Sequence, residues 1–147
     1  MLPFISYMTL NPSSQPAESC LKGKRIIIIE EDAVTEWQLE KALQRAGLDI
    51  VATAQNGHQG LDIINECQPD LVILDVRQSV SESLEIARRI LARWRVCIVL
   101  LSDYHNQADK ERARQSGLCA YLAKPLTGHA LVSALEQAYT EFQQANP

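Results

Sequence analysis

The chain has 147 residues, of which 46% are hydrophobic and 22% are charged, and its formal net charge is −4. This length suffices for one domain with a hydrophobic core, and the slight acidity argues against the basic surface that binds nucleic acid directly. No apolar run approaches the roughly 20 residues of a membrane-spanning helix, and four scattered cysteines without a C-x-x-C pair favour free thiols in a reducing cytoplasm over a zinc site or disulfides.

Residues 1–23 differ in composition from the rest of the chain. They contain three prolines and no periodic apolar pattern, which predicts a flexible N-terminal leader. Residues 2–10 are mildly apolar, as in a signal peptide, but no basic residue precedes them and polar residues interrupt them. We therefore expect a cytoplasmic protein whose folded domain covers residues 24–143 and is followed by a short tail, 144–147.

From residue 24 onward, short apolar runs alternate with longer segments whose apolar residues recur at helical spacing. The runs at 26–29 and 71–74 are continuous, which is typical of strands buried on both faces. The expected strands are 25–29, 49–54, 71–75, 96–101 and 118–123. The expected helices are 33–46, the region around 61–64, the region around 84–91, 107–116 and 131–142, with a polar loop at 76–82.

Strict alternation of strands and helices requires crossover connections, which produce a parallel sheet covered on both faces. Five strands and five helices fit the doubly wound, flavodoxin-like α/β fold with strand order 2-1-3-4-5. In such a sheet, functional groups gather at the carboxyl ends of the strands, near the point where the strand order reverses. We therefore expect the functional site at this edge.

Polar side chains stand at the carboxyl ends of four expected strands. Carboxylates that converge in one pocket repel each other unless a cation lies between them, and oxygen ligands suit Mg²⁺. A hydroxyl and an ammonium group opposite them suit the oxygens of a phosphoryl group, which a carboxylate can accept as an aspartyl phosphate. We predict a metal-assisted phosphoacceptor site on Asp75, with these residues around it: Glu30, Glu31, Asp32, Ser102 and Lys124.

Each of these residues also has a simpler structural interpretation. Residues 30–32 are acidic and can favour the start of a helix. Ser102 can cap a helix, and Lys124 with Pro125 can belong to an ordinary loop. The functional interpretation depends on all of them falling at the carboxyl ends of buried strands.

Residues 24–143 resemble the receiver domain of two-component response regulators. The motifs that carry the resemblance are Ile-Ile-Ile-Ile-Glu-Glu-Asp, Pro-Asp-Leu-Val-Ile-Leu-Asp, Val-Leu-Leu-Ser and Tyr-Leu-Ala-Lys-Pro. The resemblance implies phosphoryl transfer to Asp75 from a histidine kinase or histidine phosphotransfer protein. It also implies Mg²⁺ bound by the acidic cluster with the main-chain carbonyl of Arg77, phosphoryl oxygens bound by Ser102 and Lys124, and Tyr121 as the switch aromatic that turns inward on activation.

The family usually has a cis peptide at the position of Lys124–Pro125, and this sequence conserves that dipeptide. Elsewhere it departs from the family pattern. Glu31 stands where Asp is usual, and Asp103 stands where a small residue leaves room for the phosphoryl group. The loop after the acceptor lacks the usual Pro and Asp-Gly turn and carries Ser79, Glu82 and Ser83 instead. The long cationic side chain of Arg77 is a candidate to neutralise the carboxylates in place of a metal.

Two functions follow from these departures. In the first, the domain is phosphorylated, with weakened Mg²⁺ affinity, and signals by docking on a downstream protein. In the second, it is a degenerate receiver that binds proteins independently of phosphate. In neither is it a stand-alone enzyme, and with no output domain expected after the last helix we expect no direct contact with DNA. The family also allows a homodimer of the activated form.

Two other protein classes fit the predicted sheet less well. A flavin-binding flavodoxin relative needs a phosphate loop rich in Ser, Thr and Gly after the first strand, where residues 30–32 are acidic. A haloacid-type aspartyl phosphatase needs a second acid two residues after its nucleophile, where this chain has Arg77.

Overall fold

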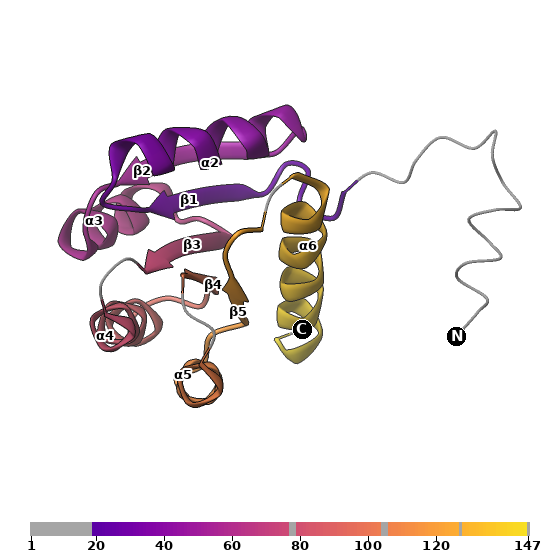
Figure 1. The fold of residues 1–147 in the computed structure, drawn as a ribbon. Helices are drawn as coiled ribbons and strands as arrows, with labels where there is room; N and C mark the ends of the chain where they lie inside the picture. The colour runs from indigo at the N-terminus through magenta and orange to yellow at the C-terminus, as the bar shows by residue number, and fades with distance from the viewer. Residues whose placement is uncertain (1–18, 77–78, 104–105, 127, 147) are drawn as a thin grey trace, which may run out of the picture.

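Strands and helices alternate along the chain in the computed structural model, which describes residues 19–76, 79–103, 106–126 and 128–146 (Figure 1). The strands are β1 (Arg25–Ile29), β2 (Asp49–Ala54), β3 (Leu71–Val76), β4 (Cys97–Ser102) and β5 (Ala120–Ala123). The helices are α2 (Ala33–Arg45), α3 (Gly57–Cys67), α4 (Val80–Leu91), α5 (Gln107–Gln115) and α6 (Gly128–Ala145).

The strands form one parallel sheet in the order β2-β1-β3-β4-β5, which confirms the predicted topology. Alternate residues of each strand point to opposite faces, so the isoleucine run of β1 contributes to two apolar layers. One layer lies under α3, α4 and α5, and the other lies under α2 and α6. Both faces of the sheet are therefore covered, and its carboxyl edge is left to carry polar groups.

Polar side chains at the N-termini decide where four helices begin. Asp32 caps α2 by accepting a hydrogen bond from the Thr35 N–H at 2.9 Å. Asn56, Ser79 and Asn106 cap α3, α4 and α5 in the same way. Asp32, expected as part of the acidic cluster, thus has the structural role of a helix cap.

Several predicted boundaries are wrong. The stretch 76–82 is not all loop, because Val76 still belongs to β3 and the cap at Ser79 starts α4 at Val80. The last helix continues to Ala145, so half of the expected tail 144–147 is helical. β5 starts two residues later than expected, because the chain bends at Cys119.

Residues 1–18 of the expected leader lie outside the described residues. Residues 19–23 do not behave as a leader, because Leu21 is fully buried in the layer beneath α2 and α6. A turn holds it there, with the Lys24 N–H donating to the Leu21 carbonyl at 3.0 Å. The folded unit therefore includes residues before 24. In the described part of the chain, no helix combines the length and apolarity needed to cross a bilayer.

Candidate functional site

Pairing of the central strands assembles the candidate site at the carboxyl edge of the sheet. Val76 of β3 pairs with Ser102 of β4, so Asp75 lies one residue before the level of Ser102. Lys124 follows β5 directly, and its N–H donates to the Ser102 carbonyl at 2.7 Å. Three groups from distant parts of the sequence therefore lie within one small region.

The Lys124 ammonium forms an ion pair with the Asp75 carboxylate. The Asp75 side chain is only 1% exposed and that of Lys124 is 19% exposed, so the pair is largely withdrawn from water. Removing either partner of such a pair would leave an uncompensated buried charge, which is strongly destabilising. Oδ2 of Asp103 lies 3.7 Å from the same ammonium nitrogen, and this second side chain is half exposed. Lys124 is thus shared between a buried and an exposed carboxylate.

Asp75 is more deeply buried than its position at a strand end suggests, but hollows approach it from two sides. One, of about 430 Å³, lies between α2 and the segment that follows β5 and is also lined by Thr35, Gln38 and Asp103. The other, of about 200 Å³, is lined by residues near the start of α3 and α4, and by Glu31. The phosphoacceptor candidate is therefore reachable despite its low exposure.

Glu30 and Glu31 have opposite environments although they are adjacent in sequence. Glu30 is fully buried, and its Oε1 accepts a hydrogen bond from the Asp32 N–H at 3.0 Å. Burial, with a smaller contribution from the neighbouring Asp75 carboxylate, raises the pKa of Glu30 to about 7 against the opposing effects of the Asp32 N–H and Lys124. Glu31 is exposed and lines the smaller hollow with Asp75. One glutamate is therefore a buried, easily protonated neighbour of Asp75, and the other faces the entrance.

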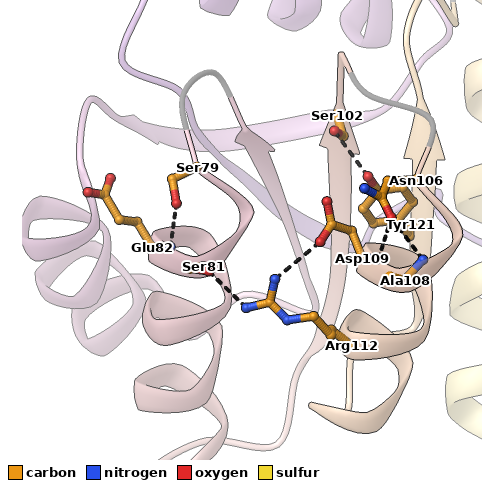
Figure 2. Close-up of polar contacts among 9 residues, drawn as sticks. All are labelled: Ser79, Ser81, Glu82, Ser102, Asn106, Ala108, Asp109, Arg112 and Tyr121. Carbon is orange, nitrogen blue, oxygen red and sulfur yellow. Dashed lines mark hydrogen bonds and ion pairs between the residues drawn. The ribbon is translucent and has the colours of Figure 1, made fainter.

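Ser102 is fully buried, and a tyrosine from the next strand reaches it. The Tyr121 hydroxyl donates to Ser102 Oγ at 3.3 Å, as Figure 2 shows. Tyr121 also packs against the apolar layer beneath α3, α4 and α5. Its ring is therefore turned toward the interior.

The helices beside the site are joined by one arginine, also shown in Figure 2. The Arg112 guanidinium of α5 donates to Ser81 Oγ of α4 at 2.8 Å and pairs with Asp109 at 3.1 Å. Ser81 lies two residues after the cap that starts α4. The start of α4 and the middle of α5 are thus connected by side chains.

The predicted magnesium ligands have the atom type that Mg²⁺ prefers, but their arrangement in space fits a metal site less well. Glu30, Glu31 and Asp75 supply carboxylate oxygens, the ligand type that Mg²⁺ prefers. Yet no group of three or more acidic, His or Cys side chains in the described ranges is arranged to hold a metal ion. The fourth predicted ligand, the Arg77 carbonyl, lies outside the described residues.

Sequence reasoning missed residues of α2 and α4 that line the hollows. Thr35 and Gln38 follow the Asp32 cap at intervals of three residues. This spacing is the sequence signal that could have placed both residues at the hollow. The polar composition of residues 76–82 predicts a loop there, but Glu82 lies in the first turn of α4 and lines the same hollow as Glu31. Recognising Ser79 as a cap would have placed Glu82 in the helix.

These features together define a receiver: a doubly wound sheet with an acidic, hydroxyl and lysine cluster at its carboxyl edge. The family model of the response regulator receiver domain matches residues 26–136. The chain therefore belongs to the response regulator receiver domain family and is a signalling domain of two-component systems. Receiver domains in general bind Mg²⁺ at an acidic pocket and interact with histidine kinases and downstream targets.

Two of the curated relatives are transcriptional regulatory proteins that are longer than this chain. PdtaR of Mycobacterium tuberculosis (strain H37Rv) is 31% identical over 121 residues, covering 82% of this chain and 59% of the relative. AfsQ1 of Streptomyces coelicolor is 35% identical over 106 residues, covering 72% of this chain and 47% of the relative. The chain thus spans about half the length of these relatives.

Solved structures show the same fold. A response regulator from Thermotoga maritima has a TM-score of 0.72 at 22% identity, covering 80% of this chain and 98% of that chain. A CheY-like receiver domain protein from Methanospirillum hungatei JF-1 has a TM-score of 0.71 at 18% identity, covering 84% and 98%.

Proposed function

We propose that this receiver domain accepts a phosphoryl group on Asp75 from a histidine kinase or a histidine phosphotransfer protein. In its phosphorylated state it docks on a downstream protein. The observation that carries the proposal is the buried ion pair between Asp75 and Lys124 beside the Ser102 hydroxyl. An ammonium and a hydroxyl around one carboxylate provide the groups that a transferred phosphoryl group requires.

The transfer is a substitution at phosphorus. An oxygen of the Asp75 carboxylate forms a new P–O bond while the P–N bond of the donor phosphohistidine breaks, and the imidazole leaves with the electron pair and then takes up a proton. Lys124 exchanges its pairing with the free carboxylate for a phosphoryl oxygen, and Ser102 donates its hydroxyl to another. Hydrolysis of the aspartyl phosphate later restores the carboxylate and releases phosphate.

Three carboxylates are the proposed holders of Mg²⁺: Glu30, Glu31 and Asp75. When bound, the cation neutralises negative charge on the phosphoryl oxygens. Glu31 is one methylene longer than the usual aspartate, which displaces its carboxylate by about 1.5 Å. Because Mg²⁺ demands near-octahedral geometry, we expect weaker binding than a receiver with aspartate at this position shows.

Tyr121 is the proposed switch residue. Its hydroxyl already contacts Ser102 Oγ, so a phosphoryl group that draws the Ser102 hydroxyl toward Asp75 changes the hydrogen bonding of the tyrosine. Phosphorylation then shifts the population of conformations, because the contacts of the phosphoryl group exist in only one of them.

Acetyl phosphate tests the proposal. The full chain is incubated with acetyl phosphate and Mg²⁺, and the intact mass is measured. We expect an added mass of about 80 Da, that of one HPO₃, which is absent from Asp75→Asn and present in Asp49→Asn, an exposed aspartate at the opposite edge of the sheet. Absence of the adduct from the wild-type chain at high Mg²⁺ contradicts the proposal and favours a binding module independent of phosphate.

A further inference from the structure

Two thiols lie together at the amino edge of the sheet, opposite the phosphoacceptor pocket. Cys97 begins β4 and is fully buried, and Cys119 directly precedes β5 and is partly buried. The Cys119 N–H donates to the Ile98 carbonyl at 2.8 Å, which holds the two segments side by side. Both cysteines belong to the apolar layer beneath α2 and α6.

The register of the two strands places these cysteines at disulfide distance. Val99 pairs with Ala120, so Cys97 and Cys119 are offset by one residue on neighbouring strands. Strands about 4.8 Å apart with a rise of about 3.3 Å per residue give a Cα–Cα distance of about 5.8 Å. Disulfides bridge Cα atoms about 4.4–6.8 Å apart. Regular alternation would put residues offset by one on opposite faces, but the bend at Cys119 turns its side chain into the layer that contains Cys97.

The two side chains also differ in burial and in the direction in which their pKa values are shifted. The neighbouring Cys97 thiol lowers the pKa of the Cys119 thiol against the opposing effects of burial and the Glu141 carboxylate. The neighbouring Cys119 thiol, together with burial, raises the pKa of Cys97. Cys119 lines a hollow of about 700 Å³ between the end of α4 and the end of α6. It is thus the accessible member of the pair and Cys97 is the buried one.

We propose that Cys97 and Cys119 form a dithiol that hydroperoxides oxidise to a disulfide, a modification site separate from the phosphoacceptor pocket. The Cys119 sulfur attacks an oxygen of ROOH, the O–O bond breaks, and RO⁻ leaves and is protonated to ROH, which leaves Cys119 as a sulfenic acid. The Cys97 sulfur then attacks the Cys119 sulfur, the S–O bond breaks, and the hydroxyl group leaves as water with the Cys97 proton. Two thiols and one hydroperoxide thereby give one disulfide, one alcohol and one water.

The positions of Lys and Arg allow each cysteine to be followed separately. Trypsin does not cleave between Lys124 and Pro125, so the four cysteines fall on four peptides: 1–22, 46–77, 96–110 and 115–147. The full chain is treated with a stoichiometric amount of hydrogen peroxide, blocked with N-ethylmaleimide and digested without reductant. We expect peptides 96–110 and 115–147 to be linked, about 2 Da lighter than their sum, and to be released by dithiothreitol.

Three variants separate the two steps, with circular dichroism as the check on folding. Cys119→Ser should abolish peroxide-dependent linkage, whereas Cys97→Ala should leave a sulfenic acid on Cys119 that dimedone traps. Cys20→Ser, the matched control on an exposed thiol, should leave the linkage unchanged. Oxidation of Cys20 or Cys67 while peptides 96–110 and 115–147 carry only maleimide overturns the proposal, and so does a linkage found only between two chains.

Discussion

The Lys124 ammonium is shared between two carboxylates, those of Asp75 and Asp103. Asp103 contributes a carboxylate oxygen 3.7 Å from the Lys124 ammonium, on the same side as the hollow that reaches Asp75. In the proposed phosphoryl transfer, an anion at this point competes for the ammonium that would bind the phosphoryl oxygens. It also repels the incoming phosphoryl group.

Asp103→Ala should therefore accelerate phosphorylation of Asp75 by acetyl phosphate. The expected gain is up to about fivefold, because an ion pair with one exposed partner is worth up to about 1 kcal/mol. Intact-mass time courses at fixed Mg²⁺ measure the rate. Asp49→Asn removes the same charge at the other edge of the sheet and should leave the rate unchanged. An Asp103→Ala rate at or below that of wild type would show that Asp103 does not restrain the reaction.

Glu30 should make stability depend on pH in metal-free buffer. Burial raises its folded-state pKa from 4.5 to about 7, so the folded protein binds a proton more tightly than the unfolded chain does. The resulting stabilisation is complete below pH 4.5 and is lost as pH rises through about 7. Urea unfolding in chelator should show the free-energy difference between wild type and Glu30→Gln falling over this range.

Glu31→Gln is the matched control for this titration. Its side chain is exposed, so comparing the two variants separates the effect of burial from the loss of a glutamate at this strand end. A Glu30→Gln difference that stays flat, or that grows with pH, would refute the assignment of a buried, readily protonated Glu30.

The packing of α3 against β1 depends on a glycine. A Cβ added at Gly60 would lie 2.5 Å from Cδ1 of Ile29, a side chain that is itself buried. Gly60→Ala should therefore destabilise the protein by about 1–2 kcal/mol, because overpacking costs about 1–3 kcal/mol and alanine recovers up to about 1 kcal/mol of helix propensity. Urea denaturation provides the measurement.

Gly57→Ala offers a comparison within the same helix. Its added Cβ would lie 2.6 Å from Ile86 Cδ1, but Ile86 is only partly buried and can rotate away. This variant should cost less than Gly60→Ala. A larger loss of stability in Gly57→Ala would contradict this expectation. It would mean that packing against α4, and not against β1, restricts the position of α3.

At the scale of the whole molecule, the chain before β1 belongs to the folded unit. Leu21 is fully buried among residues of α2, β1 and α6, although the sequence around it has no periodic pattern. Leu21→Ala should lower the free energy of unfolding by about 2–5 kcal/mol through lost burial and the cavity left behind. Val34→Ala, at a position 64% exposed, should change it by less than about 0.5 kcal/mol. Equal effects of the two substitutions would place Leu21 outside the core.

Much of the fold could be predicted from the amino-acid sequence. Continuous β-branched runs such as 26–29, alternating with segments of helical period, are local patterns, and alternation alone restricts the topology to a parallel, doubly wound sheet. The polar residues at the carboxyl ends of strands, Asp75, Ser102 and Lys124, could be named for the same reason. Parallel pairing brings those ends to one edge whatever the details of packing.

The properties that decide chemistry came only from the folded structure. The burial of Asp75, the raised pKa of Glu30, and the sharing of Lys124 with Asp103 each depend on groups that are distant in sequence. The proximity of Cys97 and Cys119 depends on the bend at Cys119, which no local sequence pattern predicts. Solvent exclusion and electrostatic interaction act over a few ångströms in space, so they can be assigned only after packing has set those distances.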